Sequence, residues 1–153
     1  MNFDVAYEKF SPLWNQPNRF YHTVENHLKP MLRECDSTEL KYFALFHDII
    51  YDPYSSTNEE NSANLFYQHR DSFDDLKDPF IVFEMIMATK NHLNSTNDLI
   101  QKAVDLDMKI LDSSFIVLLR YERGIFLEYQ KTDINEYIKN VLNFYLNIWI
   151  ELT

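Results

Sequence analysis

Apolar side chains recur every three or four residues along most of the chain, which is the spacing of an amphipathic α-helix. Polar capping residues and prolines divide this pattern into separate segments. The pattern predicts a bundle of about seven helices, over residues 3–14, 36–51, 57–66, 78–92, 98–111, 113–130 and 132–149. Residues 19–34 also carry helical spacing, but Pro30 is expected to kink or end a helix near Lys29.

The segment Lys41–Asp52 is apolar on nearly every helical side, which marks it as the central, buried helix. Asp36, three residues before Glu39, is a capping box for this helix. Pro53 disfavours a helical conformation at the residue before it, so the helix is expected to run to about Tyr51.

This apolar segment contains an adjacent histidine and aspartate, His47 and Asp48. Burying such a pair is costly unless a cation or hydrogen-bond partners compensate. A bound metal ion is the economical explanation. The alternative is a hydrogen-bonded core histidine beside a solvated aspartate.

Composition agrees with a helical globular protein that forms one domain over residues 1–153. Apolar residues make up 46% of the chain and aromatic residues 16%, which excludes a disordered protein. A single glycine in 153 residues argues against sheets joined by tight turns and against glycine-rich phosphate loops.

The formal charge of -10 argues against partners that need a basic face, namely duplex nucleic acid and anionic membranes. The lone Cys35 cannot form an internal disulfide, and no signal peptide or long apolar run is visible. The sequence therefore predicts a soluble, cytoplasmic protein. A homodimer is compatible with it.

The order His22, His47–Asp48 and Asp107 resembles the H…HD…D pattern of the HD superfamily of metal-dependent phosphohydrolases, which are all-helical proteins. Five ordered blocks resemble a small bacterial and phage branch of predicted HD-domain phosphohydrolases: Arg19–Thr23, Phe46–Pro53, Asn58–Ala63, Ala88–His92 and Asp105–Leu111. The resemblance implies a divalent metal ion held by His22, His47, Asp48 and Asp107. It further implies hydrolysis of a nucleotide or another small phosphorylated metabolite.

The residue types support such a metal site. Two imidazoles and two carboxylates suit Mn, Fe, Co, Ni, Zn or Mg, and they do not choose among these ions. At about 100° per residue, Asp107 falls near the centre of the apolar arc of its helix, whereas Asp105 points away. His22 is preferred over His27 because its distance of 25 residues from His47 resembles the family's arrangement. The family's second histidine usually follows four residues after the first, but His27 follows after five.

Three acidic residues are candidates for orienting or deprotonating the attacking water: Asp52, Glu59 and Glu60. Asp52 lies four residues after Asp48, so the two carboxylates would share a helix face. It also resembles an acidic residue near this position in nucleotide-hydrolysing HD proteins. The alternative is a loop aspartate before Pro53, and one of the two glutamates is expected to serve only as the cap partner of Thr57.

Three residues near the motif blocks are candidates for binding substrate phosphate: Arg19, Lys90 and His92. The alternative is that Lys90 only extends into solvent. In segment 113–130 the pair Glu128–Tyr129 resembles the family, whereas its arginines stand out of register.

Two rival interpretations remain from the sequence. One is a non-catalytic, metal-stabilised module that binds a nucleotide or a protein partner. The other is an HD-type oxygenase, which needs a di-iron site with more histidine ligands than His69 and His92 readily supply.

Overall fold

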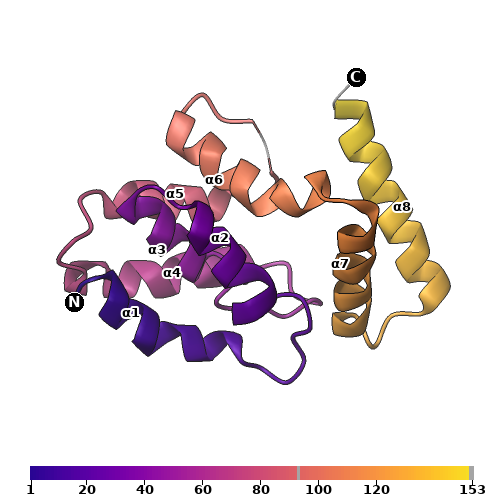
Figure 1. The fold of residues 1–153 in the computed structure, drawn as a ribbon, viewed down its shortest axis with the longest axis horizontal. Helices are drawn as coiled ribbons and strands as arrows, with labels where there is room; N and C mark the ends of the chain where they lie inside the picture. Colours follow the sequence, from indigo (N-terminus) through magenta and orange to yellow (C-terminus); the bar gives the residue numbers. More distant parts are fainter. Residues whose placement is uncertain (93, 152–153) are drawn as a thin grey trace.

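The computed structural model describes residues 1–92 and 94–151, the side chains of 148–151 excepted. All the secondary structure assigned to these residues is helical, which confirms the predicted all-α class. Its eight α-helices are drawn in Figure 1: α1 (Phe3–Phe10), α2 (Lys29–Glu34), α3 (Thr38–Phe46), α4 (Asn58–His69), α5 (Pro79–Ala88), α6 (Asp98–Met108), α7 (Phe115–Glu128) and α8 (Ile134–Glu151). None of the helices described is long and apolar enough to cross a bilayer.

Helix α3 is the centre of the hydrophobic core, as its composition predicts. It packs against α1, α4, α5 and α6, and the five consecutive residues Tyr42–Phe46 are fully buried. A helix that is apolar on all sides is stable only where other elements cover every side.

The predicted boundaries of this helix are wrong at both ends. Ser37, not Asp36, is the N-cap and accepts a hydrogen bond from the Leu40 amide at 3.2 Å. At the other end α3 stops at Phe46 rather than at Tyr51.

Tertiary hydrogen bonds explain the early end of α3. The Ser62 hydroxyl of α4 lies 3.1 Å from the Ile50 amide and 3.2 Å from the Ile50 carbonyl. The Arg19 guanidinium donates to the carbonyls of Asp48 and Ile49, at 2.7 and 2.9 Å. These partners satisfy backbone groups that would otherwise continue the helical ladder.

Pro30 separates two helices, as predicted: the π-helix Val24–Leu28 ends just before Lys29, and α2 begins there. Pro30 lies in the first turn of α2, where its missing N–H leaves no hydrogen bond unmade. The residues before it, Val24–Leu28, form a π-helix. In its first turn the Thr23 carbonyl accepts from the His27 amide at 3.1 Å and from the Leu28 amide at 3.2 Å.

Several other predicted helix starts are confirmed. Asp78 caps α5 through the amides of Phe80 and Ile81, and the Asp133 carboxylate accepts from the Asn135 amide at the start of α8. Helix α5 ends at Ala88, four residues before its predicted end.

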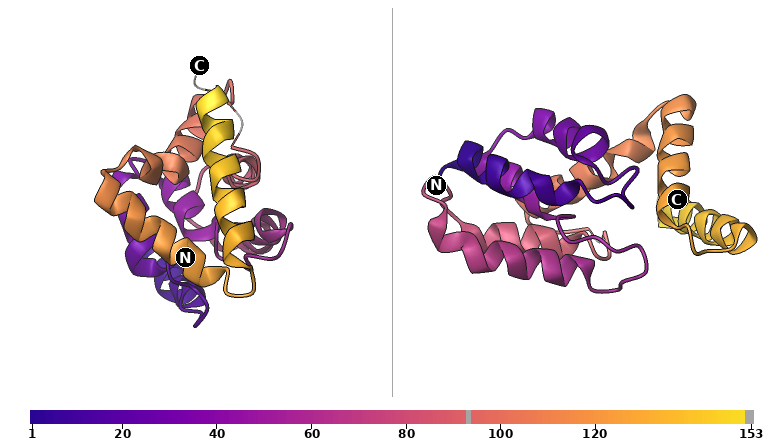
Figure 2. Two further views of the ribbon diagram at one scale, coloured as in Figure 1. Left: turned by 90° about the vertical axis from the view of Figure 1, so that its right-hand side faces the viewer. Right: turned by 90° about the horizontal axis from the view of Figure 1, so that it is seen from below.

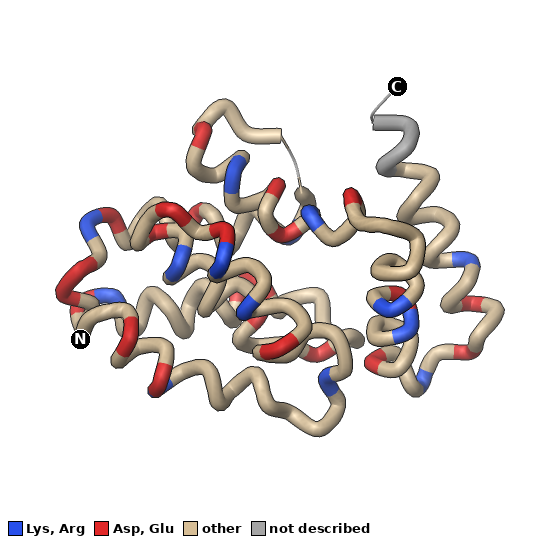
Figure 3. The backbone as a smooth tube through the Cα atoms, viewed as in Figure 1, with Lys and Arg blue, Asp and Glu red and all other residues tan. Residues whose placement is uncertain are grey.

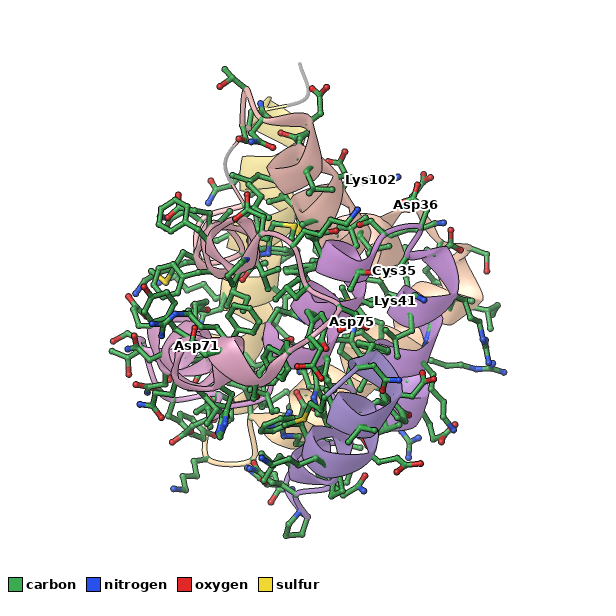
Figure 4. The ribbon with its side chains drawn as sticks, turned by 90° about the vertical axis from the view of Figure 1, so that its left-hand side faces the viewer. Cys35, Asp36, Lys41, Asp71, Asp75 and Lys102 are labelled. Carbon is green, nitrogen blue, oxygen red and sulfur yellow. The ribbon has the colours of Figure 1, made fainter. Side chains whose placement is uncertain are left out.

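Polar contacts hold the N-terminus and the loop before α5 against the core, on the face shown in Figure 4. Asp75 accepts hydrogen bonds from the Tyr42 hydroxyl at 2.8 Å and from the Phe3 amide at 2.9 Å. On the same face Lys102 of α6 pairs with Asp36, which joins α6 to the turn before α3.

Helices α7 and α8 run antiparallel and form a hairpin at one end of the molecule, beside the body made by α1–α6 (Figures 1 and 2). The backbone of α7 approaches the body closely at Gly124, where an added Cβ would lie 3.0 Å from the Cβ of Tyr21. The hairpin therefore meets the body next to the segment that carries His22.

Candidate metal centre

Four side chains from three separate segments meet at one point. They are His27 of the π-helix, His47 and Asp48 of the turn after α3, and Asp107 in the last turn of α6. One ligand atom from each lies within 4.8 Å of all the others. The early end of α3 turns the His47 and Asp48 side chains toward the same point.

The spacing of the donor atoms fits a metal ion. His47 Nε2 lies 3.0 Å from His27 Nε2, 3.2 Å from Asp48 Oδ2 and 3.5 Å from Asp107 Oδ1. His27 Nε2 lies 3.6 Å from Asp48 Oδ2 and 3.4 Å from Asp107 Oδ1. Neighbouring ligands bound to one ion at ~2.0–2.2 Å are about 3.0–3.6 Å apart, so these five distances match those of a coordination shell.

Hydrogen bonds behind the histidines orient their rings. The Ala44 carbonyl lies 3.0 Å from His47 Nδ1 and can only accept, so Nδ1 carries the proton and Nε2 faces the other donors. The Tyr21 hydroxyl lies 3.0 Å from His27 Nδ1 and forms a hydrogen bond with that ring nitrogen, which leaves Nε2 to face the other donors. Such outer contacts commonly orient histidine ligands of metal ions.

The electrostatics of the group call for a positive charge at its centre. Burial opposes a charge on His47, but Asp48 and Asp107 outweigh burial and raise its pKa to about 10. Burial also opposes ionisation of the two carboxyl groups, yet the neighbouring histidines hold the pKa of each below its ordinary range. His27 differs, because burial dominates and lowers its pKa. Without a metal ion, a proton on His47 supplies the charge that the carboxylates require.

The four-donor group contains His27 in the place predicted for His22. Between Thr23 and Leu28 the π-helix adds one residue to the turn, and this brings His27 to the cluster although it follows His22 by five residues. His22 itself lies next to the group, with its Nε2 3.6 Å from Asp48 Oδ2. The spacing of four residues is that of an α-helix, and the π-helix lengthens it to five.

Glu128, at the end of α7, holds the segment that precedes the π-helix. Its Oε1 accepts hydrogen bonds from the amides of Phe20, Tyr21 and His22 at 2.8, 2.7 and 2.9 Å. Its Oε2 accepts from His22 Nδ1 at 2.7 Å and from the Tyr51 hydroxyl at 2.8 Å. Burial would raise the pKa of Glu128, but the hydrogen bonds from His22 and the backbone lower it to about 2.

The Glu128–Tyr129 pair is visible in the sequence, but its position there does not place it in the predicted site. A signal was present, because an acidic residue in the last turn of a helix opposes the helix dipole and needs a compensating partner. The partner is a run of three backbone amides more than 100 residues away, and local spacing cannot reveal it.

A pocket of about 310 Å³ lies beside the four-donor group. Its polar lining includes His22, His27, Asp48, Glu59, His92 and Asp107, and its aromatic lining includes Tyr51, Tyr121, Tyr129 and Phe144. Among the described residues, none that lines this pocket is a lysine or an arginine.

The two predicted phosphate-binding cations are engaged elsewhere. Arg19 is buried, and its guanidinium donates to the carbonyls of His22, Asp48 and Ile49, so it organises the backbone under the site. Lys90 pairs with Glu60 and donates to the Ser56 carbonyl at 2.8 Å.

The third predicted phosphate contact, His92, does line the pocket. Its Nε2 lies 3.1 Å from Asp107 Oδ2, and Asp107 outweighs the effect of burial and raises the pKa of His92. His92 has a φ of 49°, a left-handed conformation that costs free energy in a non-glycine residue. Strain of this kind is often found at functional sites.

The three acidic residues predicted to orient or deprotonate the attacking water differ in their position relative to the pocket. Asp52 is exposed in the loop after α3, and its Oδ1 accepts from the Tyr54 amide at 2.9 Å, so it does not share a helix face with Asp48. Glu60 is paired with Lys90. Glu59, in the first turn of α4, is the one of the three that lines the pocket. Asp105 is exposed and accepts from Gln101, as its position on α6 predicts.

Comparison with protein-family models finds no match, and searches against curated proteins and against solved structures find no significant similarity. Function is therefore inferred from the residues of the site.

Proposed function

We propose that this protein is a metal-dependent phosphohydrolase of the HD type that acts on a nucleotide or another small phosphorylated metabolite. The observation that carries the proposal is the four-donor group of His27, His47, Asp48 and Asp107 beside a pocket. Two imidazoles and two carboxylates form a mixed nitrogen and oxygen set that suits Mn, Fe, Co, Ni, Zn or Mg. The adjacent His-Asp pair and the distal Asp follow the order of the HD resemblance.

A divalent cation at this point would polarise a phosphoryl oxygen and lower the pKa of a water molecule. The protein's part is to hold and orient. His47 presents Nε2 because the Ala44 carbonyl holds its other ring nitrogen, and the two carboxylates balance the charge. Rigid donors of this kind keep the reacting groups in one arrangement.

We assign Glu59 to orient or deprotonate the attacking water. Glu59 lines the pocket, whereas Asp52 is exposed and Glu60 is neutralised by Lys90. A general base has to lie within reach of the water that it activates, so position decides among the three carboxylates.

His92 and His22 are the two histidines that line the pocket outside the four-donor group, and both are placed to contact a bound phosphate. Asp107 raises the pKa of His92, which favours its charged form, and Glu128 holds the His22 ring through Nδ1. Because no lysine or arginine lines the described pocket, phosphate affinity has to come mainly from the metal ion. The aromatic residues of the lining suit the flat base of a nucleotide.

The first experiment is a phosphatase screen over nucleotides with protein loaded separately with Mn, Co, Ni, Zn and Mg. We expect turnover that needs a metal ion and is abolished by Asp107→Ala, because that variant removes a ligand. The matched pair Glu59→Gln and Asp52→Asn tests the base. Glu59→Gln should retain its metal ion and lower kcat by ~100-fold or more, whereas Asp52→Asn should leave kcat nearly unchanged.

Two results would contradict these assignments. Wild-type turnover by Glu59→Gln would remove that residue from the chemistry. Absence of turnover on every nucleotide and every other small phosphorylated metabolite tested, with the metal ion bound, would refute the hydrolase.

A non-catalytic, metal-stabilised module is the second candidate, and the engaged Arg19 and Lys90 favour it. In that case calorimetry would detect a nucleotide or another partner binding to metal-loaded protein without any release of phosphate.

A further inference from the structure

The outward faces of α7 and α8 expose a set of large apolar side chains. Seven of them are between 50% and 72% exposed: Phe115, Ile116 and Leu119 on α7, and Ile134, Ile138, Leu142 and Leu146 on α8. We call these seven residues the hairpin face. Soluble monomers seldom expose apolar patches of more than a few hundred Å², and larger patches mark interaction sites.

The pattern on α8 is that of a helix covered on two sides. Ile134, Ile138, Leu142 and Leu146 are four residues apart, so they lie within an arc of about 120°. A second apolar side, which includes Tyr137, Val141 and Phe144, faces α7, and the Tyr137 hydroxyl donates to Glu122 at 3.1 Å. The side that carries Ile134, Ile138, Leu142 and Leu146 is therefore as apolar as a buried side, although no other described part of the chain covers it.

The area of the hairpin face matches that of a stable dimer. Its seven side chains are on average a little over half exposed. At about 180 Å² for a large apolar side chain, the face presents roughly 700 Å² per chain. A standard protein–protein interface buries about 800 Å² on each partner.

Charge also favours a second copy as the occupant. Residues 115–151 contain four Lys and Arg residues and five Asp and Glu residues, so the hairpin has a formal charge of only -1, and -9 of the formal charge of -10 lies on the rest of the chain. Figure 3 shows how few charged residues lie along the described part of α8. Two acidic chains can therefore associate through their hairpins while their acidic bodies stay apart, which limits repulsion.

We infer that the hairpin face pairs with the same face of a second copy of this chain, forming a symmetric dimer around a four-helix contact. The inference does not depend on the proposed function. It does bear on the pocket, because Tyr121, Ile125 and Tyr129 of the hairpin segment and Phe144 of α8 line it. A partner hairpin would thus steady one wall of the candidate site.

The test is the molar mass of the full-length protein by light scattering, at about 50 μM and on dilution to about 1 μM. Wild type should give twice the 18.5 kDa of one chain. The double variant Ile138→Glu/Leu142→Glu should give a single chain, because four carboxylates would be buried in the apolar contact, and its dissociation constant should rise at least ~100-fold. The control Asn143→Glu/Asn147→Glu adds the same charge on the polar side of α8 and should remain a dimer.

A charge exchange keeps the test valid if a variant folds poorly. Ile138→Lys/Leu142→Lys should also be a single chain, and mixing it with the Glu variant should restore the doubled mass, which unfolded chains would not do. A wild type that stays a single chain at 50 μM, or a Glu variant that stays a dimer, would overturn the inference. Binding of a single-chain wild type to neutral lipid vesicles would also overturn it and would assign the face to a membrane surface.

Discussion

Glu128→Gln is the substitution that tests the structure most sharply. Glutamine keeps the size and shape of the side chain but removes its charge. The glutamine oxygen can still accept from the amides of Phe20, Tyr21 and His22. In the wild type the second carboxylate oxygen accepts from His22 Nδ1 at 2.7 Å and from the Tyr51 hydroxyl at 2.8 Å. In the variant these two groups would face the NH₂ group instead. The substitution therefore removes two charge-assisted hydrogen bonds, and the neutral bonds that His22 and Tyr51 can form by accepting from the NH₂ group are weaker.

The expected loss follows from the pKa of Glu128. The hydrogen bonds of the folded protein lower this pKa from 4.5 to about 2. Each pKa unit corresponds to ~1.4 kcal/mol, so the ionised carboxylate stabilises the fold by about 3 kcal/mol. The side chain is fully buried, and solvent screening therefore does not reduce this value appreciably. In a chain of this length we expect the Tm to fall by about 6–12 °C.

The pH dependence has a definite sign. A carboxyl group whose pKa is lower in the folded than in the unfolded state stabilises the protein where both forms are ionised. The contribution of Glu128 is therefore complete above about pH 4.5 and disappears as the pH falls through 2. The difference between wild type and Glu128→Gln should shrink to less than half at pH 3.

The measurement is urea unfolding at pH 7 and at pH 3, followed by circular dichroism in the presence of a chelator. Glu136→Gln on the exposed side of α8 is the control and should change the free energy of unfolding by less than about 0.5 kcal/mol. If Glu128→Gln unfolds within about 0.5 kcal/mol of wild type at pH 7, Glu128 does not hold the hairpin to the body.

Three further predictions follow from the geometry. Gly124→Ala should destabilise the protein by about 1–2 kcal/mol in thermal unfolding, because its Cβ would meet Tyr21 at 3.0 Å and this outweighs the higher helix propensity of alanine; a gain in Tm would show that the helix can shift. His27→Ala should abolish metal binding in calorimetry, whereas His22→Ala should weaken it by about 10-fold to 100-fold, and the reverse order would put the ligand at His22. Metal affinity should rise by up to about tenfold per pH unit between pH 6 and 9, because the ion displaces the proton from His47, whose pKa is about 10; a flat titration would show that no proton is released.

The helical class and the identity of the central helix could be predicted from the sequence. Apolar spacing reports the side of a helix that is buried, and the run Tyr42–Phe46 has no polar side at all, so its central position follows from burial alone. Three of the four clustered donors were predicted because each is a polar residue in an apolar surrounding, which is costly without a partner.

The helix boundary after Phe46 could not be predicted from local pattern. The residues that follow are as apolar as those before, and only Ser62 and Arg19, brought close by folding, provide the hydrogen bonds that end the helix. The role of Asp52 was inferred from a helix that does not extend to it.

The sequence by itself determined that the chain is helical, that α3 is its core, and that His47, Asp48 and Asp107 need a compensating charge. Only the tertiary structure decided that His27 joins them, that Arg19 is a backbone clamp, and that Glu128 fastens the hairpin. The physical reason is the separation along the sequence over which each kind of interaction acts. Burial and helix spacing act between near neighbours, whereas hydrogen bonds to backbone groups join residues about 30 to more than 100 positions apart, and no local pattern records them.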